Sequence, residues 1–220
     1  LARSAVKGKP YTVSETNHPF PNEYACEGIP ILAAYALLQD WDGLYFYTFE
    51  HADPALWKTK TPGYFDIMHD PAKLSNLASS DLKASENVID RYYSEDEIRE
   101  GIRTRQDEMP FFTPGFNSEL ALKYQTRIAG FTGGENNFPV MERGNTIVSE
   151  TDQLIWHRNT DKGLVQINSP ASQGLIGCSE AIPALNCENL KVELTTAFAS
   201  VFLSTFDGIP ISNSEKLLLT

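Results

Sequence analysis

The fold prediction depends most on residues 9–49, which read KPYTVSETNHPFPNEYACEGIPILAAYALLQDWDGLYFYTF. Residues 10–14 are mostly aromatic or β-branched, which predicts a short strand. After a Pro-rich loop, residues 23–38 place apolar side chains at a helical period, and Pro30 is expected to kink or restart that helix. The nearly continuous apolar run 44–49 is typical of a strand buried on both faces, as in a parallel sheet. Together these residues predict one strand–helix–strand unit.

The second half of the chain changes period and predicts short antiparallel strands. Residues 154–157 and 164–168 flank a Gly-containing loop, which favours a β-hairpin. Residues 190–196 alternate between polar and apolar side chains, and 198–206 and 216–220 also have strand composition. Short strands at this spacing are typical of an antiparallel sandwich. The apolar end of the last segment is expected to need a partner strand.

Two local patterns predict helix starts. Asp70 followed by Pro71 combines an N-cap residue with a proline at the first helical position. Residues 94–97 (SEDE) fit a capping box, and the helix that they begin is expected to run to about Glu108. Its few apolar side chains favour a surface position.

Composition and charge exclude several classes of partner and ligand. The net charge is −11, with lysine and arginine scattered, which argues against nucleic acid or an anionic membrane as partner. A neutral polysaccharide carries no charge that the chain would repel. No apolar run is long enough for a transmembrane helix. No glycine-rich nucleotide motif and no zinc-ligand spacing occurs, so neither a cofactor nor a metal is expected.

The three cysteines, Cys26, Cys178 and Cys187, give no complete disulfide framework because their number is odd. A bridge between Cys178 and Cys187 is open if the two residues flank one loop. Free buried thiols are the favoured interpretation.

Several short segments resemble a known enzyme family. Residues 9–15 (KPYTVSE), 17–24 (NHPFPNEY) and 41–49 (WDGLYFYTF) look like the seventh strand, seventh helix and eighth strand of cellulase-like (clan A) glycoside hydrolases. Residues 152–156 (DQLIW) and 163–174 (GLVQINSPASQG) resemble the β-sandwich that follows the barrel in some bacterial members. The resemblance covers roughly residues 9–80 and, more loosely, residues 140–220.

This resemblance implies a fold of class α/β plus all-β. The first part is a partial (β/α) barrel that holds the last βαβ units, and the second part is an antiparallel β-sandwich. Two prolines and two phenylalanines within residues 109–115 favour a boundary nearby. The implied domains are residues 1–110 for the barrel segment, 111–139 for the linker and 140–220 for a sandwich that need not be complete.

The resemblance also implies a set of site residues. In that family the glutamate at the end of the seventh strand is the nucleophile of a retaining mechanism, and by position it is Glu15. Structural interpretations stay open, with Glu15 as a solvated loop acid and His18 as a loop histidine. The implied substrate-binding residues are Trp57, as a stacking residue for a sugar ring, and the polar side chains of Asn17, His18, Glu50 and His51.

One part of the family's site has no counterpart in this sequence. The family carries its acid/base carboxyl group in an Asn-Glu motif on the fourth strand, and the residues before position 9 are too few to hold that strand. Asn22 and Glu23 match the motif in letters only, since they follow the seventh strand. The chain is therefore expected to be a fragment, a truncated product, or a homo-oligomer that completes the barrel by association.

Three functions remain open at this point. The first is a glycoside hydrolase, or the C-terminal part of one, that cleaves a polysaccharide or oligosaccharide with Glu15 as nucleophile. The alternative is a non-catalytic carbohydrate-binding or assembly module, which the missing acid/base favours. A weaker option is a hydrolase of another bond on the same scaffold. The location of the protein is open, with secretion as the expectation for polysaccharide cleavage.

Overall fold

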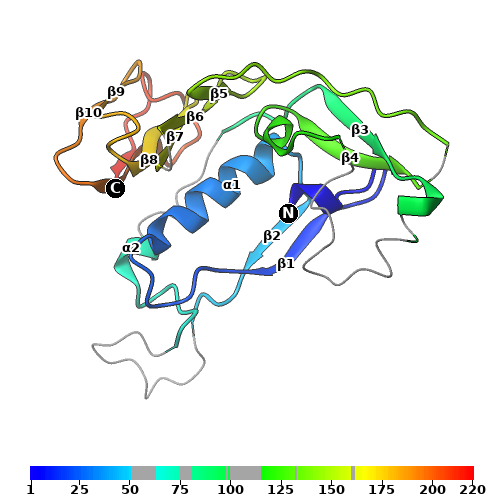
Figure 1. Cartoon of the computed structure of the whole chain (residues 1–220). Helices are drawn as coiled ribbons and strands as arrows, with labels where there is room; N and C mark the ends of the chain where they lie inside the picture. The colour runs from blue at the N-terminus through cyan, green and yellow to red at the C-terminus, as the bar shows by residue number, and fades with distance from the viewer. Residues whose placement is uncertain (51–62, 75–80, 98, 100–114, 132, 160–161) are drawn as a thin grey trace.

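The computed structural model describes residues 1–50, 63–74, 81–97, 99, 115–131, 133–159 and 162–220. It holds 34% strand and 16% helix. In the described part, the strands form one six-stranded antiparallel sheet and three two-stranded sheets (Figure 1). A (β/α) barrel needs a helix after each of its parallel strands. The prediction of a partial barrel is therefore wrong, because too little helix is present and the largest sheet is antiparallel.

The predicted strand–helix–strand unit is nevertheless present. Strands β1 (Thr12–Thr16) and β2 (Gly43–Phe46) pair in parallel, and α1 (Gly28–Leu38) lies between them in the sequence. A short 3₁₀ helix, η2 (Ala25–Glu27), precedes α1. Pro30 lies in the first turn of α1, where a missing N–H removes no intrahelical hydrogen bond. The helix therefore accommodates Pro30 as its third residue.

The six-stranded sheet contains the residues that were predicted as short strands. Its order is β12-β11-β8-β7-β6-β5, and each neighbouring pair is antiparallel. The predicted hairpin is confirmed by β6 and β7, and the C-terminal leucines pair with β11. The strands of the sheet are β5 (Thr146–Val148), β6 (Leu154–Asn159), β7 (Lys162–Asn168), β8 (Ser172–Cys178), β11 (Phe198–Thr205) and β12 (Leu217–Leu219), and a separate hairpin consists of β9 (Ala184–Asn186) and β10 (Lys191–Glu193).

The two faces of this sheet pack against different layers. Val165 and Ile176 are buried on one face together with Tyr35 of α1. Leu164 and Leu175 belong to the other face, since neighbouring residues of a strand point to opposite sides, and they pack with residues of the β9–β10 hairpin. The predicted two-sheet sandwich is therefore wrong, because the large sheet has a helix as its partner on one face.

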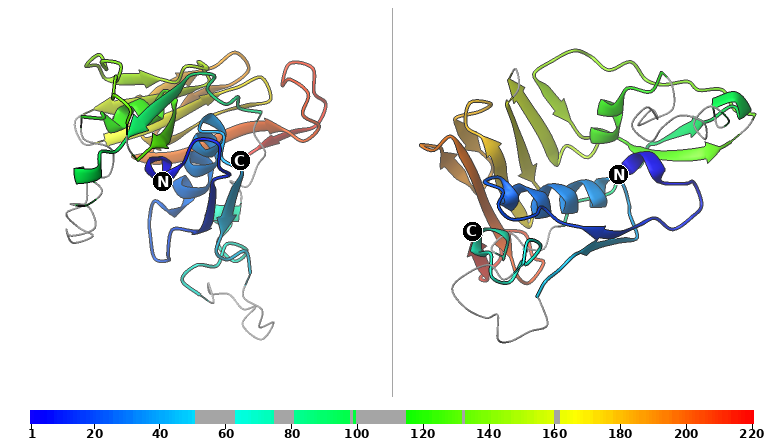
Figure 2. Two further views of the ribbon diagram at one scale, coloured as in Figure 1. Left: turned by 90° about the vertical axis from the view of Figure 1, so that its right-hand side faces the viewer. Right: turned by 60° about the horizontal axis from the view of Figure 1, so that its bottom comes forward.

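Helix α1 is enclosed on nearly all sides. In Figures 1 and 2 it lies between the six-stranded sheet and the β1–β2 pair. Leu37 is the one side chain of α1 that is exposed, while Ala34, Tyr35, Ala36 and Leu38 are buried. The hydrophobic core of the sheet is thus shared with the strand–helix–strand unit.

A second parallel pair lies beside this core. It consists of β3 (Val88–Tyr92) and β4 (Gln125–Gly130), with η1 (Ala2–Ser4) and η4 (Ser118–Leu122) nearby. Arg91 is fully buried, and its Nε donates a hydrogen bond to Thr126 Oγ1 at 2.7 Å. Strand β4 falls inside the segment 111–139 that was predicted as a linker, while the domain limits themselves stay a prediction.

Both predicted helix starts are confirmed. Asp70 Oδ1 accepts hydrogen bonds from the backbone N–H of Ala72 (3.1 Å) and Lys73 (3.2 Å) at the start of α2 (Pro71–Leu74). Ser94 and Glu97 form the reciprocal capping box, at 2.7 and 3.2 Å. The rest of that predicted helix, to Glu108, lies mostly outside the described residues. All three cysteines are free, as the favoured interpretation predicted, and they are half-buried.

Residues 81–87 connect the large sheet to the β3–β4 pair. Asp81 accepts a hydrogen bond from the backbone N–H of Ala171 at 3.1 Å, and Leu82 belongs to the core that α1 shares with the sheet. At the other end, Glu150 accepts hydrogen bonds from Ser85 Oγ and from the backbone and side chain of Asn87. Desolvation favours a raised pKa for Glu150, but these hydrogen bonds outweigh it and hold the pKa below its usual range.

Replacing Glu150 by glutamine is expected to lower the free energy of unfolding by about 1 kcal/mol at pH 7, because hydrogen bonds to a partly exposed carboxylate are lost. A lowered pKa in the folded state means that this stabilisation is present at neutral pH and is lost as the pH falls through the lowered pKa. The difference between wild type and Glu150→Gln in urea unfolding should therefore shrink below about pH 4. Glu188→Gln, on an exposed carboxylate, is the matched control, and a pH-independent difference would contradict the expectation.

Candidate functional site

The candidate site lies at the carboxyl ends of β1 and β2. Thr16 of β1 pairs with Phe46 of β2, so the residues that precede them, Glu15 and Tyr45, lie on neighbouring strands. Glu15 is exposed, and its carboxylate makes no hydrogen bond or ion pair with the residues that the structure describes. The carboxylate is therefore open to solvent and to a ligand.

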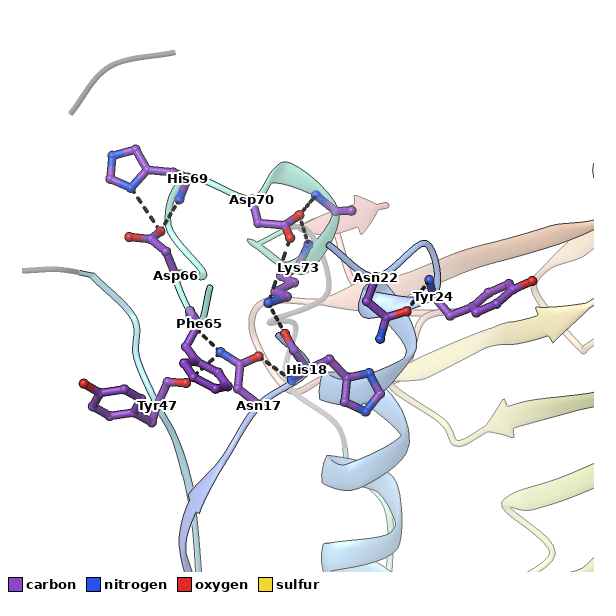
Figure 3. A network of polar contacts seen from close by, with 11 residues as sticks. Asn17, His18, Asn22, Tyr24, Tyr47, Phe65, Asp66, His69, Asp70 and Lys73 are labelled. Atoms are coloured by element: carbon purple, nitrogen blue, oxygen red, sulfur yellow. Dashed lines mark hydrogen bonds and ion pairs between the residues drawn. The ribbon is translucent and has the colours of Figure 1, made fainter. Parts of the chain in front are cut away.

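Asn17 holds three segments together just beyond β1. Its side-chain Nδ2 donates to the carbonyl oxygen of Tyr47 (2.8 Å) and to that of Phe65 (2.6 Å), and its Oδ1 accepts from the backbone N–H of His18 (2.8 Å; Figure 3). The donors of the amide are thus used within the protein. Asn17 was predicted to bind substrate, and this geometry gives it a positioning role, because it fixes the ends of β1 and β2 relative to each other.

The ring of His18 packs against the start of α1. A Cβ atom at Gly28 would lie 3.0 Å from His18 Nδ1, so the glycine makes room for the imidazole. His18 Nδ1 is buried and has no hydrogen-bond partner among the described residues. Burial raises the pKa of Glu27, and the nearby His18 partly offsets that rise. This close packing supports the structural interpretation of His18 as a loop histidine.

Lys73 is a buried cation that the sequence analysis did not single out. Its side chain is fully buried, and Nζ donates a hydrogen bond to the carbonyl oxygen of His18 and lies 4.0 Å from Asp70 Oδ2 (Figure 3). Desolvation lowers the pKa of Lys73, while Asp70 and Asp66 partly oppose this effect. Lys73 therefore ties α2 to the loop that follows β1.

Asp66 and His69 form a second polar pair near the same loop. Asp66 is fully buried, and its Oδ1 accepts the backbone N–H of His69 (2.8 Å) and lies 3.0 Å from His69 Nδ1. The segment that carries them is paired with the chain beyond β2, since Ile67 donates its N–H to the carbonyl oxygen of Thr48 at 3.1 Å. A carboxylate in this position orients the imidazole ring.

Aromatic side chains line the outer side of β2 and its extension. Tyr45, Tyr47 and Phe49 are 61%, 48% and 53% exposed, and we call these three residues the aromatic stripe. The Tyr47 and Phe65 rings are in edge contact at 6.0 Å between centroids. The prediction that residues 44–49 are buried on both faces is wrong, because β2 belongs to a two-stranded pair and alternate side chains face solvent.

The other predicted binding residues divide into two groups. Glu50 directly follows the aromatic stripe and is half-buried, and its carbonyl oxygen accepts a hydrogen bond from Thr48 Oγ1 at 3.3 Å. The structure thus brings Glu15, Asn17, His18 and Glu50 to the ends of two adjacent strands. His51 and Trp57 lie outside the described residues.

Within the described ranges, no group of three or more histidine, cysteine, aspartate or glutamate side chains is placed to hold a metal ion. No helix in that part of the chain combines the length and the apolar character that crossing a membrane requires.

Comparisons with known proteins add no further information: no family model, no curated protein and no solved structure matches this chain. The geometry of the site is therefore the evidence for its function. Its features are an open carboxylate, a fixed loop around Asn17 and an exposed aromatic stripe on the adjacent strand.

Proposed function

We propose that this chain carries the nucleophile of a retaining glycoside hydrolase, with Glu15 as the attacking carboxylate and a polysaccharide or oligosaccharide as substrate. The observation that supports it best is the open carboxylate of Glu15 at the end of β1, next to the exposed aromatic stripe of β2. Binding sites for small organic ligands combine aromatic faces with a few fixed polar groups. Tyr45 and Tyr47 supply such faces for the apolar side of a sugar ring.

The proposed chemistry has two steps. The ionised carboxylate of Glu15 attacks the anomeric carbon, a C–O bond to the enzyme forms, and the glycosidic C–O bond breaks as a carboxylic acid protonates the departing oxygen. Water then attacks the same carbon, giving up its proton to the second carboxylate, and Glu15 leaves as a carboxylate. Two carboxyl groups are candidates for this second role: Glu50 follows the aromatic stripe, and Glu27 precedes α1 beside His18. The raised pKa of Glu27 suits a proton donor.

The nucleophile can be tested separately from the acid/base. A dinitrophenyl leaving group departs without protonation, so a dinitrophenyl 2-deoxy-2-fluoro glycoside needs the nucleophile alone for the first step. Incubation with a panel of these glycosides is expected to leave one covalent glycosyl group on Glu15, detected by intact mass and located by peptide mass spectrometry. The Glu15→Gln variant should stay unlabelled, while Glu23→Gln, on an exposed carboxylate of the next loop, should label like wild type. Labelling at another carboxylate would sink the assignment.

A non-catalytic carbohydrate-binding module is the second candidate, and one observation favours it. The carboxylate of Glu15 has no hydrogen-bond partner among the described residues, whereas catalytic groups are held by neighbouring side chains. Oligosaccharide binding that is weakened by Tyr47→Ala, together with no labelling by any activated glycoside, would favour the binding module over the hydrolase.

A further inference from the structure

A cavity lies on the outer side of β3, away from the Glu15 site. Its volume is about 440 Å³, within the range of about 300–1,000 Å³ that is usual for small-ligand pockets. It shares no residue with the candidate site. We call it the β3 groove, and it is lined by Asn87, Val88, Ile89, Asp90, Tyr92, Tyr124, Glu135, Asn137 and Pro139.

One wall of the β3 groove is held by hydrogen bonds between a side-chain amide and the strand backbone. Asn136 Oδ1 accepts the N–H of Tyr92 and Asn136 Nδ2 donates to the carbonyl oxygen of Tyr92, both at 2.9 Å. This pair holds segment 135–139 against the strand. Gly134 lies directly on the ring of Tyr92, where a Cβ atom would come within 2.2 Å of the ring. The groove is therefore formed before any ligand arrives.

The floor of the groove is set by the alternation of β3. Val88, Asp90 and Tyr92 face outward, while Arg91 is buried on the opposite side. Asp90 is held by an ion pair with Lys7, at 2.5 Å between Lys7 Nζ and Asp90 Oδ2. Tyr124 packs one part of its ring against the cluster of Ile89, Phe116 and Leu120, which keeps the ring in place.

The chemistry of the lining selects for a neutral ligand with many hydroxyl groups. Tyr92, Tyr124 and Pro139 give apolar faces, and the side-chain amide of Asn137 both donates and accepts hydrogen bonds. The carboxylate of Glu135 accepts hydrogen bonds from hydroxyl groups and repels anions, while the charge of Asp90 is balanced by Lys7. This combination of flat apolar surface and mixed hydrogen-bonding groups fits sugar rings.

We infer that the β3 groove is an accessory binding site for a neutral oligosaccharide, separate from the Glu15 site. The choice of carbohydrate as ligand class rests on the proposed function, whereas the groove itself is defined by its own residues. A chain that binds polymer at two separate places gains effective concentration for the second contact, which raises the overall affinity for a long polymer.

The test uses the full chain with Glu15→Gln as background, so that no ligand is cleaved during calorimetric titration. Neutral soluble gluco-, manno- and xylo-oligosaccharides are the probes, and an oligogalacturonate is the charged comparison. Asn137→Ala and Tyr124→Phe each remove hydrogen-bonding capacity and are expected to weaken neutral-sugar binding about tenfold, a loss of about 1.4 kcal/mol. Tyr124→Phe keeps the packed ring, and circular dichroism checks that both variants are folded.

Arg143→Ala is the matched control, because Arg143 lines a different polar cavity between η4 and β6. Binding unchanged in Asn137→Ala and Tyr124→Phe, or lost in Arg143→Ala, would overturn the inference, as would tighter binding of oligogalacturonate. The two proposals fail separately. Sugar binding that depends on the groove, without labelling of Glu15, would refute Glu15 as nucleophile and support the accessory site. Labelling of Glu15, with sugar binding that does not depend on the groove, would support the nucleophile and refute the accessory site.

Discussion

Hydrolysis of an activated aryl glycoside is expected to fall by about a thousandfold or more in the Glu15→Gln variant, since loss of a covalent nucleophile removes the low-barrier route and leaves only binding and residual stabilisation. Glutamine has the size of glutamate, and Glu15 is exposed, so the substitution leaves the packing of β1 unchanged. The measurement is kcat/KM for wild type and variant on the same glycoside. An unchanged kcat/KM would remove Glu15 from the mechanism.

The same site allows a chemical rescue that only a nucleophile would show. In Glu15→Ala the space left by the carboxylate admits azide, which attacks the anomeric carbon directly. One displacement in place of two is expected to give a glycosyl azide of inverted configuration, detected by nuclear magnetic resonance, and to restore part of the lost rate. Glu23→Ala provides the matched control on an exposed carboxylate of the loop that follows β1. A product of retained configuration would contradict the assigned role.

The largest effect on stability is expected from Gln39→Leu, at about 3 kcal/mol in the free energy of unfolding, because three buried partners lose a hydrogen bond worth about 1 kcal/mol or more each. Gln39 is 1% exposed and follows α1 directly. Its Nε2 donates to the carbonyl oxygens of Ala121 (2.8 Å) and Tyr124 (2.5 Å), and its Oε1 accepts the N–H of Thr126 (3.1 Å). Leucine fills the volume and satisfies none of these groups.

Urea unfolding measures this loss as a shift of the transition midpoint. The slope of the transition is expected to stay constant, because the variant exposes the same amount of surface on unfolding. Asn213→Leu makes a comparable polar-to-apolar change on the surface and should alter the free energy of unfolding by less than about 0.5 kcal/mol. If Gln39→Leu lowered the free energy of unfolding by no more than the control does, these hydrogen bonds would not couple α1 to β4.

The features that sequence predicted well depend on residues close together in the chain. The helix start at Asp70 and the capping box of Ser94 and Glu97 need only three or four residues, and the β6–β7 hairpin needs a short loop between two strands. The barrel prediction failed because it depended on which elements pack against α1. A helix that is apolar on nearly every side fits the outside of a barrel sheet or the space between two layers, and its own residues do not distinguish these arrangements.

The candidate site shows the same division. Glu15 and Asn17 were proposed from the resemblance of one short segment to a known motif, and their roles stay predictions. Lys73 was missed because its partner, the carbonyl oxygen of His18, is 55 residues away, and a buried lysine has no local sequence pattern. Asp66 was missed for a similar reason, since only the pairing of its segment with the chain beyond β2 brings it to the site.

The two hydrogen bonds between Asn136 and the backbone of Tyr92 also bear on self-association. Strand edges with free N–H and C=O groups are where chains add to one another as extra strands. At Tyr92 the side-chain amide of Asn136 already occupies both groups, as a neighbouring strand would. A second copy therefore finds no free backbone at Tyr92, whereas β12 and β5, at the two borders of the large sheet, are edges where a strand could be added.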